Sequence, residues 1–300
     1  MKRALFKKQI FFVLTFSVLA IIGLSLFLII NFSSPKTEVR LVSSLQDQTI
    51  PEKNISPSIN EAQKKKEEEK KKAEETRRFI EQYGPCRYLP VLTYHHIGDG
   101  TDSLFVKTDT FASQMEYLAR KGYTTITLVD LVNNLQNGTP LPAKPIILTF
   151  DDGYRDFYEN AYPILKAHNF KATLFVITQF VGGSAYLQYV TWDQLAQMSS
   201  SGLVTIGDHT LSHLPLPSLL PDRVKDEIIS AKNILESRLG KHVDVFAYPY
   251  GSDSDESEKV LREGGFAVAV TTKRGLACAK LPYEIPRIRM GNAPIASYGF

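Results

Sequence analysis

Residues 146–153, Ile146-Ile147-Leu148-Thr149-Phe150-Asp151-Asp152-Gly153, form a run of apolar and β-favouring residues that leads into two carboxylates and a glycine. The pattern predicts a buried strand that ends in a turn. Because successive side chains of a strand point to opposite faces, Asp151 and Asp152 can do different jobs, one at a metal and one at a water or substrate. The alternative is an ordinary Asp-Asp-Gly turn, in which Asp accepts backbone hydrogen bonds and Gly supplies a positive φ.

A second short apolar run, residues 204–208, ends in the polar segment His209-Thr210-Leu211-Ser212-His213. On a helical turn, the spacing of four would place both imidazoles on one face. Such a pair alone is a weak signal, since surface and capping histidines are common. Together with Asp152 it forms a His2Asp donor set with an open position, which is typical of catalytic zinc and also suits cobalt or nickel.

Three segments, in their order along the chain, resemble the motif series of the polysaccharide deacetylases (NodB-like, carbohydrate esterase family 4). They are residues 149–153, residues 209–213 and Tyr248-Pro249-Tyr250-Gly251. The resemblance covers roughly Leu89 to Met290 and is carried mainly by the first two segments. It implies an α/β fold, a distorted parallel (β/α) barrel of NodB type with fewer than eight complete units.

The resemblance also implies roles for individual residues. The metal ligands would be one carboxylate and two imidazoles: Asp152, His209 and His213. Asp151 would be the general base that takes the proton of the attacking water. The backbone N–H of Tyr250 would bind the oxyanion. Alternatively, or in addition, Tyr248, Pro249 and Tyr250 would wall a sugar-binding groove.

In most of the family, the general acid is a histidine in a C-terminal Leu-x-His motif. This chain departs from that pattern. The tail here reads Ile285-Pro286-Arg287-Ile288-Arg289-Met290, and no histidine follows His242. His95, at the end of the first predicted strand, resembles the histidine of the permuted branch that includes poly-β-1,6-N-acetylglucosamine deacetylases. His96 is the reserve candidate, because only one of two adjacent strand residues should face the site. The alternative is that both are ordinary strand-end histidines.

An arginine usually stands two residues before the proline of the family's third motif, where this chain has Ala247. Arg287 or Arg289 is expected to replace it by hydrogen bonding to Asp151. Strand alternation would put both arginines on the same face, and Arg287 is preferred.

Residues 10–30 form an uncharged run long enough to span a bilayer. Basic residues precede it, so the positive-inside rule predicts a cytoplasmic tail (1–9), a single-pass transmembrane anchor (10–30) and an extracellular remainder at the bacterial cell surface. A cleaved signal peptide is the alternative, although the run is long for one and lacks a good small-residue cleavage site. A buried core helix fits this length and these flanks poorly.

Residues 31–83 are expected to form a linker that includes a solvated, charged helix over residues 64–78, stabilised by i,i+4 pairs such as Glu74 with Arg78. Residues 84–300 would form the catalytic domain. Strands and helices alternate over it, which predicts a parallel sheet, although the pattern alone does not separate a barrel from an open doubly wound sheet.

Local signals predict several helix boundaries in this domain. Thr127 with Asp130 resembles a capping box, and Thr191 is a possible N-cap. Helices are expected over Pro221–Leu239, ended by Gly240, and over Asp255–Glu263.

Cys86 and Cys278 lie near the two ends of the predicted domain. Outside the cytosol such a pair can form a disulfide, and two free thiols are the alternative. The formal net charge of +3 is too small to argue for a nucleic-acid partner.

These features predict a membrane-anchored, metal-dependent deacetylase of an extracellular N-acetylglucosamine polymer. The N-terminal position of His95 favours poly-β-1,6-N-acetylglucosamine, with peptidoglycan next. An O-acetyl glycan esterase would use the same chemistry. A catalytically inactive carbohydrate-binding protein on the same fold is the third reading, and the retained Asp151, Asp152, His209 and His213 count against it.

Overall fold

The computed structural model describes residues 56–183 and 188–300. The predicted cytoplasmic tail (1–9), transmembrane anchor (10–30) and first part of the linker lie outside the described residues. Among the residues that are described, no helix is both long and apolar enough to cross a membrane. The chain divides into two compact units, Met1–Ala73 and Glu74–Phe300.

The charged segment forms helix α2 (Ser56–Tyr83), which runs across the boundary of the two units. Its described side chains are mostly exposed. Arg78 forms an i,i+4 ion pair with Glu74 at 2.8 Å, one of the pairs expected from the sequence. The prediction of a solvated helix is therefore confirmed for this segment.

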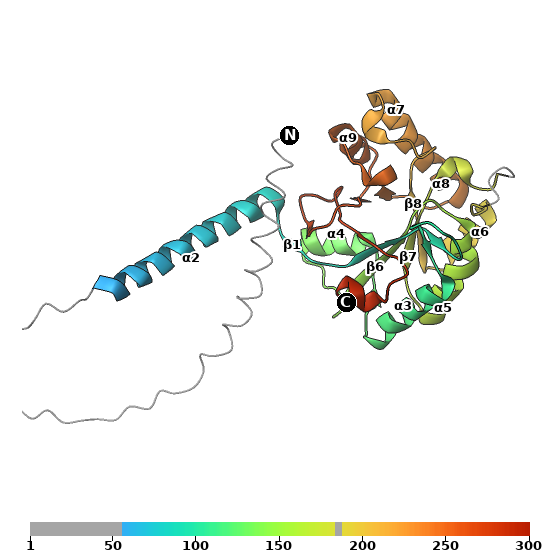
Figure 1. Ribbon diagram of the computed structural model, residues 1–300. Coiled ribbons are helices and arrows are strands. Elements are labelled where there is room, and N and C mark those ends of the chain that lie inside the picture. Colours follow the sequence, from blue (N-terminus) through green and yellow to red (C-terminus); the bar gives the residue numbers. More distant parts are fainter. Residues whose placement is uncertain (1–55, 184–187) are drawn as a thin grey trace, which may run out of the picture. The chain divides into compact units, whose positions relative to one another are not determined.

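A parallel sheet forms the centre of the second unit (Figure 1). Its strands follow the order β10-β9-β8-β7-β6-β2-β12, and β5 pairs with β6 beside this path. The strands are β2 (Val91–Tyr94), β5 (Thr124–Thr125), β6 (Pro145–Phe150), β7 (Ala172–Val176), β8 (Val204–Asp208), β9 (Val245–Ala247), β10 (Val268–Val270) and β12 (Ile288–Arg289). Every pairing in this sheet is parallel. The predicted α/β class with a parallel sheet is confirmed, and the sheet is curled in the manner of a partial barrel.

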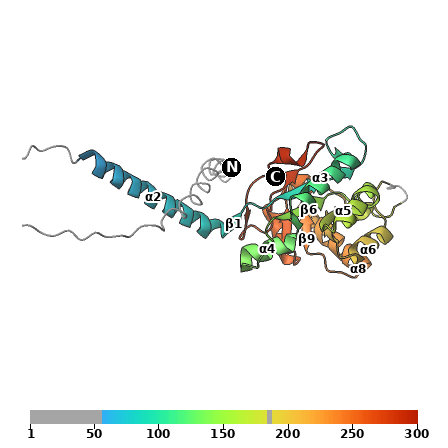
Figure 2. The same cartoon turned by 90° about the horizontal axis from the view of Figure 1, so that it is seen from below.

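Helices lie on both faces of the sheet (Figures 1 and 2). They are α3 (Thr108–Arg120), α4 (Leu128–Asn137), α5 (Tyr162–His168), α6 (Trp192–Ser200), α7 (Pro221–Lys225), α8 (Ala231–Leu239) and α9 (Asp255–Glu263). Two short π-helical segments continue into α-helices. They are η1 (Phe157–Ala161), which precedes α5, and η5 (Asp226–Ser230), which lies between α7 and α8. Segments α7, η5 and α8 together occupy the predicted helix Pro221–Leu239, and Gly240 ends it in a left-handed conformation.

Strand β6 separates two hydrophobic clusters by the alternation of its side chains. Ile146, Leu148 and Phe150 belong to the larger cluster, which contains residues of α3, α5, α6 and α8. Ile147 points to the other face and packs with residues of α4, β9 and β10. Since Thr149 follows Ile147 by two residues, its side chain lies on the α4 side of the sheet, the side from which Arg287 approaches.

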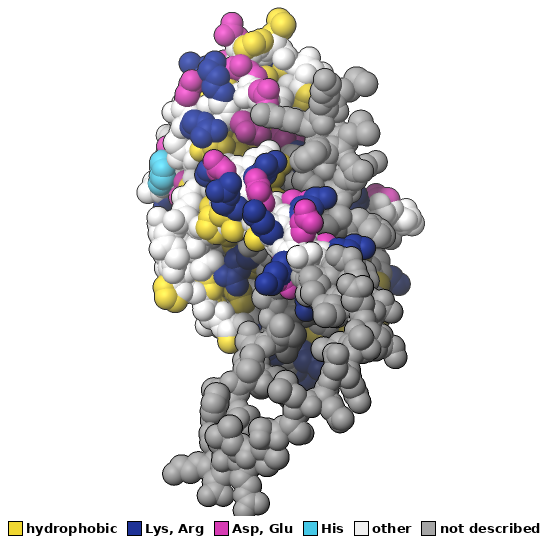
Figure 3. Space-filling model, turned by 90° about the vertical axis from the view of Figure 1, so that its left-hand side faces the viewer, with side chains coloured by type: hydrophobic (Ala, Val, Ile, Leu, Met, Phe, Trp, Pro, Cys, Tyr) yellow, Lys and Arg dark blue, Asp and Glu magenta, His cyan; other side chains and the backbone are white. Residues whose placement is uncertain are grey.

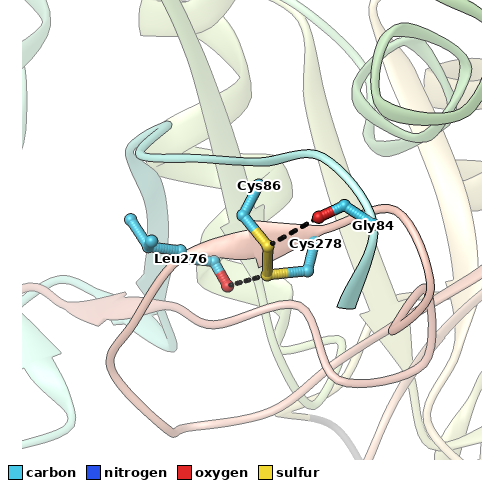
Figure 4. The surroundings of a disulfide bond; sticks show 4 residues. All are labelled: Gly84, Cys86, Leu276 and Cys278. Carbon is cyan, nitrogen blue, oxygen red and sulfur yellow. Dashed lines mark hydrogen bonds between the residues drawn. A yellow bond between two sulfur atoms is a disulfide. The ribbon is translucent and has the colours of Figure 1, made fainter. Parts of the chain in front are cut away.

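The N-terminal and C-terminal parts of the domain meet in a small antiparallel pair, β1 (Cys86–Arg87) with β11 (Ala277–Cys278). Cys86 and Cys278 form a disulfide there, with their Cα atoms 4.0 Å apart. Figure 4 shows each sulfur beside a backbone carbonyl, that of Gly84 at 3.5 Å and that of Leu276 at 3.8 Å. The sequence left open a disulfide or two free thiols, and the structure contains the disulfide.

The predicted strand over Ile285–Met290 is much shorter in the structure. Ile285 makes an isolated bridge to Val270, and regular pairing resumes only at Ile288 in β12. Arg287 lies outside the strand and is buried, whereas Arg289 is exposed and bonds to Ser103. Arg289 pairs in register with Thr93, and Thr93 with Thr149, so the two arginines differ in burial and in partners and not in the side of the sheet they face.

Positive and negative side chains are mixed on the molecular surface. Figure 3 shows Lys and Arg side chains beside Asp and Glu on the part of its face that is not grey. Interspersed charges of this kind suit the small net charge of +3.

Candidate active site

The predicted site residues follow strands β6, β8 and β9 of the parallel sheet, with β7 between β6 and β8. Asp151 and Asp152 follow β6, His209 follows β8, and Tyr248 follows β9. In parallel α/β sheets, ligands bind at the carboxyl ends of the strands, because the loops there converge. The structure thus brings segments almost 100 residues apart in sequence to one edge of the sheet.

Asp152 lies in a tight turn directly after β6, with a positive φ of 72°. Gly153 follows with φ 78°, and a Cβ atom on it would lie 2.9 Å from a methyl group of Val176. The turn therefore needs glycine at this position both for its backbone angle and for the close approach to β7. The turn interpretation and the functional interpretation of the Asp-Asp-Gly segment are both compatible with this geometry.

Three side chains converge at this edge in a geometry that fits a divalent metal ion. Oδ1 of Asp152 lies 3.3 Å from Nε2 of His209 and 3.5 Å from Nε2 of His213. Tetrahedral zinc with bonds of about 2.0–2.1 Å separates its ligand atoms by roughly 3.3–3.4 Å. One carboxylate and two imidazoles leave a coordination position for water or substrate. The donor set and its spacing therefore fit a divalent metal site of the catalytic zinc type.

The spacing of the two histidines had suggested a helical turn, but the structure does not place them on one. Residues 209–213 form an irregular loop after β8, in which Thr210 and His213 have positive φ values of 68° and 63°. A β-branched residue in this conformation is strained by about 1–3 kcal/mol and needs support from its surroundings. The loop, and not a helix, brings the imidazoles together.

Buried hydrogen bonds support this loop. Both carboxylate oxygens of Glu227, from η5, accept bonds from Ser212, one from its backbone N–H at 2.9 Å and one from its hydroxyl at 2.7 Å. The backbone carbonyl of Glu227 also accepts the N–H of Leu211. Asp208 accepts the N–H of Thr210 at 2.7 Å. The sequence analysis missed Glu227, although an acidic residue on the apolar side of a predicted helix was a signal for it.

The two imidazoles differ in their protonation. Nδ1 of His209 lies 2.7 Å from the carbonyl oxygen of Ala247, to which it donates, so the neutral ring presents the Nε2 lone pair toward Asp152. Burial lowers the pKa of His209, but the hydrogen bond and charge of Asp152 outweigh it and raise that pKa, so a bound metal ion would displace a proton from Nε2. Burial, followed by the neighbouring His209, lowers the pKa of His213 to about 4. The ring of His213 also contacts Tyr250, with ring centres 4.7 Å apart. His213 is therefore neutral near pH 7.

Asp151 and Arg287 form a buried bidentate ion pair. Nη1 and Nη2 of Arg287 each lie 2.7 Å from one oxygen of the carboxylate. Arg287 is held in turn by the carbonyl of Thr271 at 2.9 Å and the hydroxyl of Thr149 at 3.1 Å. Burial alone would raise the pKa of Asp151, but the charge and hydrogen bonds of Arg287 outweigh it and hold that pKa well below its usual range. Asp151 is therefore ionised at neutral pH.

His95 and His96 point in different directions from adjacent positions. Nε2 of His95 lies 4.0 Å from a carboxylate oxygen of Asp151, so this imidazole borders the site. Burial lowers the pKa of His95, and the nearby Asp151 opposes this effect. Nδ1 of His96 instead lies 2.5 Å from Asp156, away from Asp151. The geometry thus places the first candidate for the general acid, and not the reserve, beside Asp151.

The third motif presents only one of its side chains to solvent. Tyr248 is completely buried and Pro249 is buried, so these two side chains do not wall an open groove as one expectation had them. Tyr250 is 65% exposed and has a positive φ of 59°, which turns its side chain outward over His213. Of the three residues predicted to contact the substrate, Tyr250 is the one whose side chain is exposed.

Comparisons with known proteins identify the family of this chain. The family model described as polysaccharide deacetylase matches residues 138–269, which contain all three proposed metal ligands. A Bacillus subtilis protein, YxkH, whose name assigns it to the same family, is 32% identical over 229 residues, covering 76% of this chain and 80% of its own. The chain belongs to the polysaccharide deacetylase family. The prediction of a deacetylase enzyme is confirmed by this membership.

Two further proteins are similar to this polysaccharide deacetylase. The Streptococcus pyogenes deacetylase PplD, solved in complex with acetate, superimposes with a TM-score of 0.67 at 30% identity, covering 72% of this chain and 98% of that one. The poly-β-1,6-N-acetyl-D-glucosamine N-deacetylase of Escherichia coli K12 is 27% identical over 256 residues. That alignment covers 71% of this chain but only 38% of the E. coli protein.

Proposed function

We propose that this polysaccharide deacetylase removes N-acetyl groups from an extracellular N-acetylglucosamine polymer, with poly-β-1,6-N-acetylglucosamine as the favoured substrate. The observation that carries the proposal is the convergence of Asp152, His209 and His213 beside the ionised Asp151. The name of the E. coli relative and the position of His95 ahead of the Asp-Asp segment favour the β-1,6 polymer. Peptidoglycan is the second candidate substrate.

The metal would be held by Oδ1 of Asp152 and Nε2 of both histidines, and zinc is the favoured ion. When bound, it would acidify a water molecule and polarise the carbonyl of the acetamido group. The neutral state of His213 and the Nε2 lone pair of His209 prepare both imidazoles for this role.

Asp151 is the proposed general base. Its low pKa keeps it in the carboxylate form that can accept a proton from the attacking water. Arg287 fixes the plane of the carboxylate through two bonds and screens its charge in a buried environment. Arg287 therefore acts through Asp151 as a positioning residue.

His95 and Tyr250 complete the proposed machinery. His95, 4.0 Å from Asp151, would donate a proton to the leaving amine. The backbone N–H of Tyr250 would stabilise the oxyanion, a contribution worth about 3 kcal/mol of barrier for a well-placed donor. The exposed ring of Tyr250 would also offer an apolar face to a pyranose.

The proposed domain arrangement is a membrane anchor at residues 10–30, a spacer over 31–83 and a catalytic domain over 84–300. This arrangement would present the active site to polymer outside the cell.

Acetate release from N-acetylglucosamine oligomers tests the function. The full-length protein should release acetate from β-1,6 oligomers, and a chelator should abolish the release until zinc is restored. Release from β-1,4 oligomers alone would transfer the proposal to peptidoglycan-like substrates. Release only from O-acetylated glycans would identify an esterase, and binding without any release would identify an inactive carbohydrate-binding protein.

Asp152→Ala should abolish both metal retention and acetate release, because it removes one of three ligands. Zinc content of the purified protein and turnover are measured together. Asp226→Ala is the matched control, since the Asp226 side chain is 59% exposed on η5 and should leave both unchanged. Wild-type turnover in Asp152→Ala would exclude the metal assignment.

A further inference from the structure

We propose that Asp156 and Asn160 are positioning residues for His95, and that they act by holding the two residues that follow it in the chain. The inference rests on the proposed function, in which His95 gives a proton to the leaving amine. It goes beyond that function by naming the side chains that determine where the imidazole of His95 lies.

His95 lies between two strands and belongs to neither of them. Strand β2 ends at Tyr94, and β3 (His96–Ile97) begins directly after His95. The main sheet holds the chain before His95, because the carbonyl of Tyr94 accepts the N–H of Asp151 at 3.0 Å. Strand β3 pairs with β4 (Phe105–Val106) and not with the main sheet. The position of His95 therefore depends on what holds the chain immediately after it.

Asp156 holds the first of these following residues, His96. Oδ2 of Asp156 lies 2.5 Å from Nδ1 of the imidazole, and the imidazole donates, since a carboxylate only accepts. The ring of His96 also stacks on Phe105, with centres 4.1 Å apart, and on Tyr154, with centres 3.5 Å apart. Both partners of the hydrogen bond are largely buried. The side chain of His96 is therefore fixed in its plane and in its direction.

Asn160 holds the second following residue, Ile97. Nδ2 of Asn160 donates to the backbone carbonyl of Ile97 at 2.6 Å. The side chain of Ile97 is completely buried in the larger hydrophobic cluster. Asp156 directly precedes η1 and Asn160 lies within it. One short element thus holds two successive residues of β3.

The same stretch of chain carries the proposed general base. Asp151 follows β6, and the turn after it leads into Asp156 and η1. The contacts of η1 with β3 therefore tie the position of His95 to that of Asp151, and Nε2 of His95 lies 4.0 Å from Oδ2 of Asp151. A misplacement of about 1 Å can cost about 100-fold in rate, so contacts outside the site can control turnover.

A proton from His95 matters only for a poor leaving group. In amide hydrolysis, the water oxygen adds to the acetyl carbon and Asp151 takes a proton from it. The C–N bond then breaks, the nitrogen takes a proton from His95, and the products are acetic acid and a free amine. Exchange with water restores both residues. An aryl acetate instead breaks its C–O bond to give a phenolate, which leaves without a proton.

The two substrates therefore distinguish a positioning role from a structural one. A displaced general acid should slow the hydrolysis of the amide and spare that of the aryl ester. A loosened fold or a weakened metal site should slow both, because both reactions use the same attacking water and the same base.

The test uses Asp156→Ala in the full-length protein, which removes the acceptor for Nδ1 of His96. We expect kcat for an N-acetylglucosamine oligomer to fall by about 10- to 100-fold. For para-nitrophenyl acetate, kcat should stay within about twofold of the wild-type value. Asp156→Asn keeps an oxygen that can accept the bond and should restore most of the loss. Glu159→Ala is the matched control, since Glu159 is an exposed acidic residue of η1.

Asn160→Ala provides a second, independent variant. It removes the bond to the carbonyl of Ile97 and should give the same pattern with a smaller loss. Circular dichroism establishes which variants are folded, and the Asn160→Ala result stands even if Asp156→Ala does not fold. Zinc content should match the wild type in every variant, because a loss of metal would slow both substrates.

The outcomes separate this inference from the proposed function. His95→Ala is the reference, and it should slow turnover of the oligomer and spare the aryl acetate. If it does so while the folded variants at Asp156 and Asn160 behave as wild type, or slow both substrates equally, the inference is overturned and the deacetylase proposal stands. If His95→Ala slows both substrates equally or neither, the role of His95 fails and this inference with it. Absence of acetate release from the wild-type protein would overturn the proposed function as well.

Discussion

At the scale of single residues, the Asp151 carboxylate is buried, and Arg287 is the residue that keeps it ionised. The pKa of Asp151 is held below its usual range, so this carboxylate stays charged throughout any practical assay. Protonation of Asp151 should therefore not produce the acid limb of the wild-type pH–rate profile.

Arg287→Gln should make the protonation of Asp151 visible in the acid limb of the pH–rate profile. Without the guanidinium, burial dominates and the pKa of Asp151 rises, so the carboxylate becomes protonated at higher pH. We expect kcat/KM at pH 7 to fall by about 10- to 100-fold and its acid limb to move to higher pH. The measurement is the pH dependence of acetate release.

Arg289→Gln is the control for this prediction, since Arg289 belongs to the same C-terminal segment but is exposed. It should keep the acid limb of the wild-type profile. An acid limb in Arg287→Gln at the same pH as in the wild type would show that Arg287 does not control the ionisation of Asp151.

The metal-ligand candidates could be found from the sequence because their chemistry is rare at this spacing. Asp152, His209 and His213 combine two short motifs, each of which follows a strand-like run. Glu227 was not found, because an acidic residue on a predicted helix is common and only the fold shows its partners. Tyr248 was misplaced because a motif does not show which of its side chains is buried.

At the scale of structural elements, the histidine loop after β8 depends on η5 for its shape. Glu227 is 1% exposed and accepts two hydrogen bonds from Ser212 through its carboxylate. The strained backbone at Thr210 and His213 persists because such bonds hold the loop.

Glu227→Ala should loosen this loop. It leaves the buried N–H of Ser212 without its acceptor, which costs about 1–3 kcal/mol. We expect a matching loss in the free energy of unfolding, measured with urea, together with weaker zinc binding. Asp226→Ala changes the adjacent, exposed acidic residue and should leave both quantities unchanged. Equal effects of the two substitutions would rule out the supporting role of Glu227.

Helix boundaries were the features that could be predicted best, because the sequence signals that mark them are local. The capping box of Thr127 and Asp130 and the N-cap at Thr191 are both present, and α9 has the predicted bounds. The two-residue strands β1, β4 (Phe105–Val106), β5 and β11 were not predicted. Such short strands carry no periodicity, and their partners lie far away in sequence or form only after the chain has folded.

At the scale of the whole molecule, the Cys86–Cys278 disulfide closes nearly the entire second unit into one covalent loop, with a sequence separation of 192 residues. A long loop loses much conformational entropy when the unfolded chain is cross-linked, and native disulfides typically contribute about 2–4 kcal/mol. The curled parallel sheet could be predicted as a class, but its closure could not, since this depends on pairing between distant segments.

The double substitution Cys86→Ser and Cys278→Ser should lower the free energy of unfolding by about 2–4 kcal/mol. Acetate release at 25 °C should stay near the wild-type value, because neither cysteine belongs to the candidate active site. Reduction of the disulfide in the wild-type protein should lower the free energy of unfolding by the same amount, and either single substitution should do so as well. An unchanged melting temperature in all of these would refute a stabilising role for the bond.

The same bond has a mechanical consequence. A pull on the chain ahead of Cys86 passes through the two sulfur atoms to Cys278 and on toward the C-terminus, along covalent bonds alone. Strands β2 and β5 to β10, with the loops that carry Asp152 and His209, lie inside the bypassed segment and bear none of this load, whereas β12 follows Cys278. A pull between the two ends of the chain therefore leaves the segment between the cysteines unloaded, and it cannot unzip that segment strand by strand.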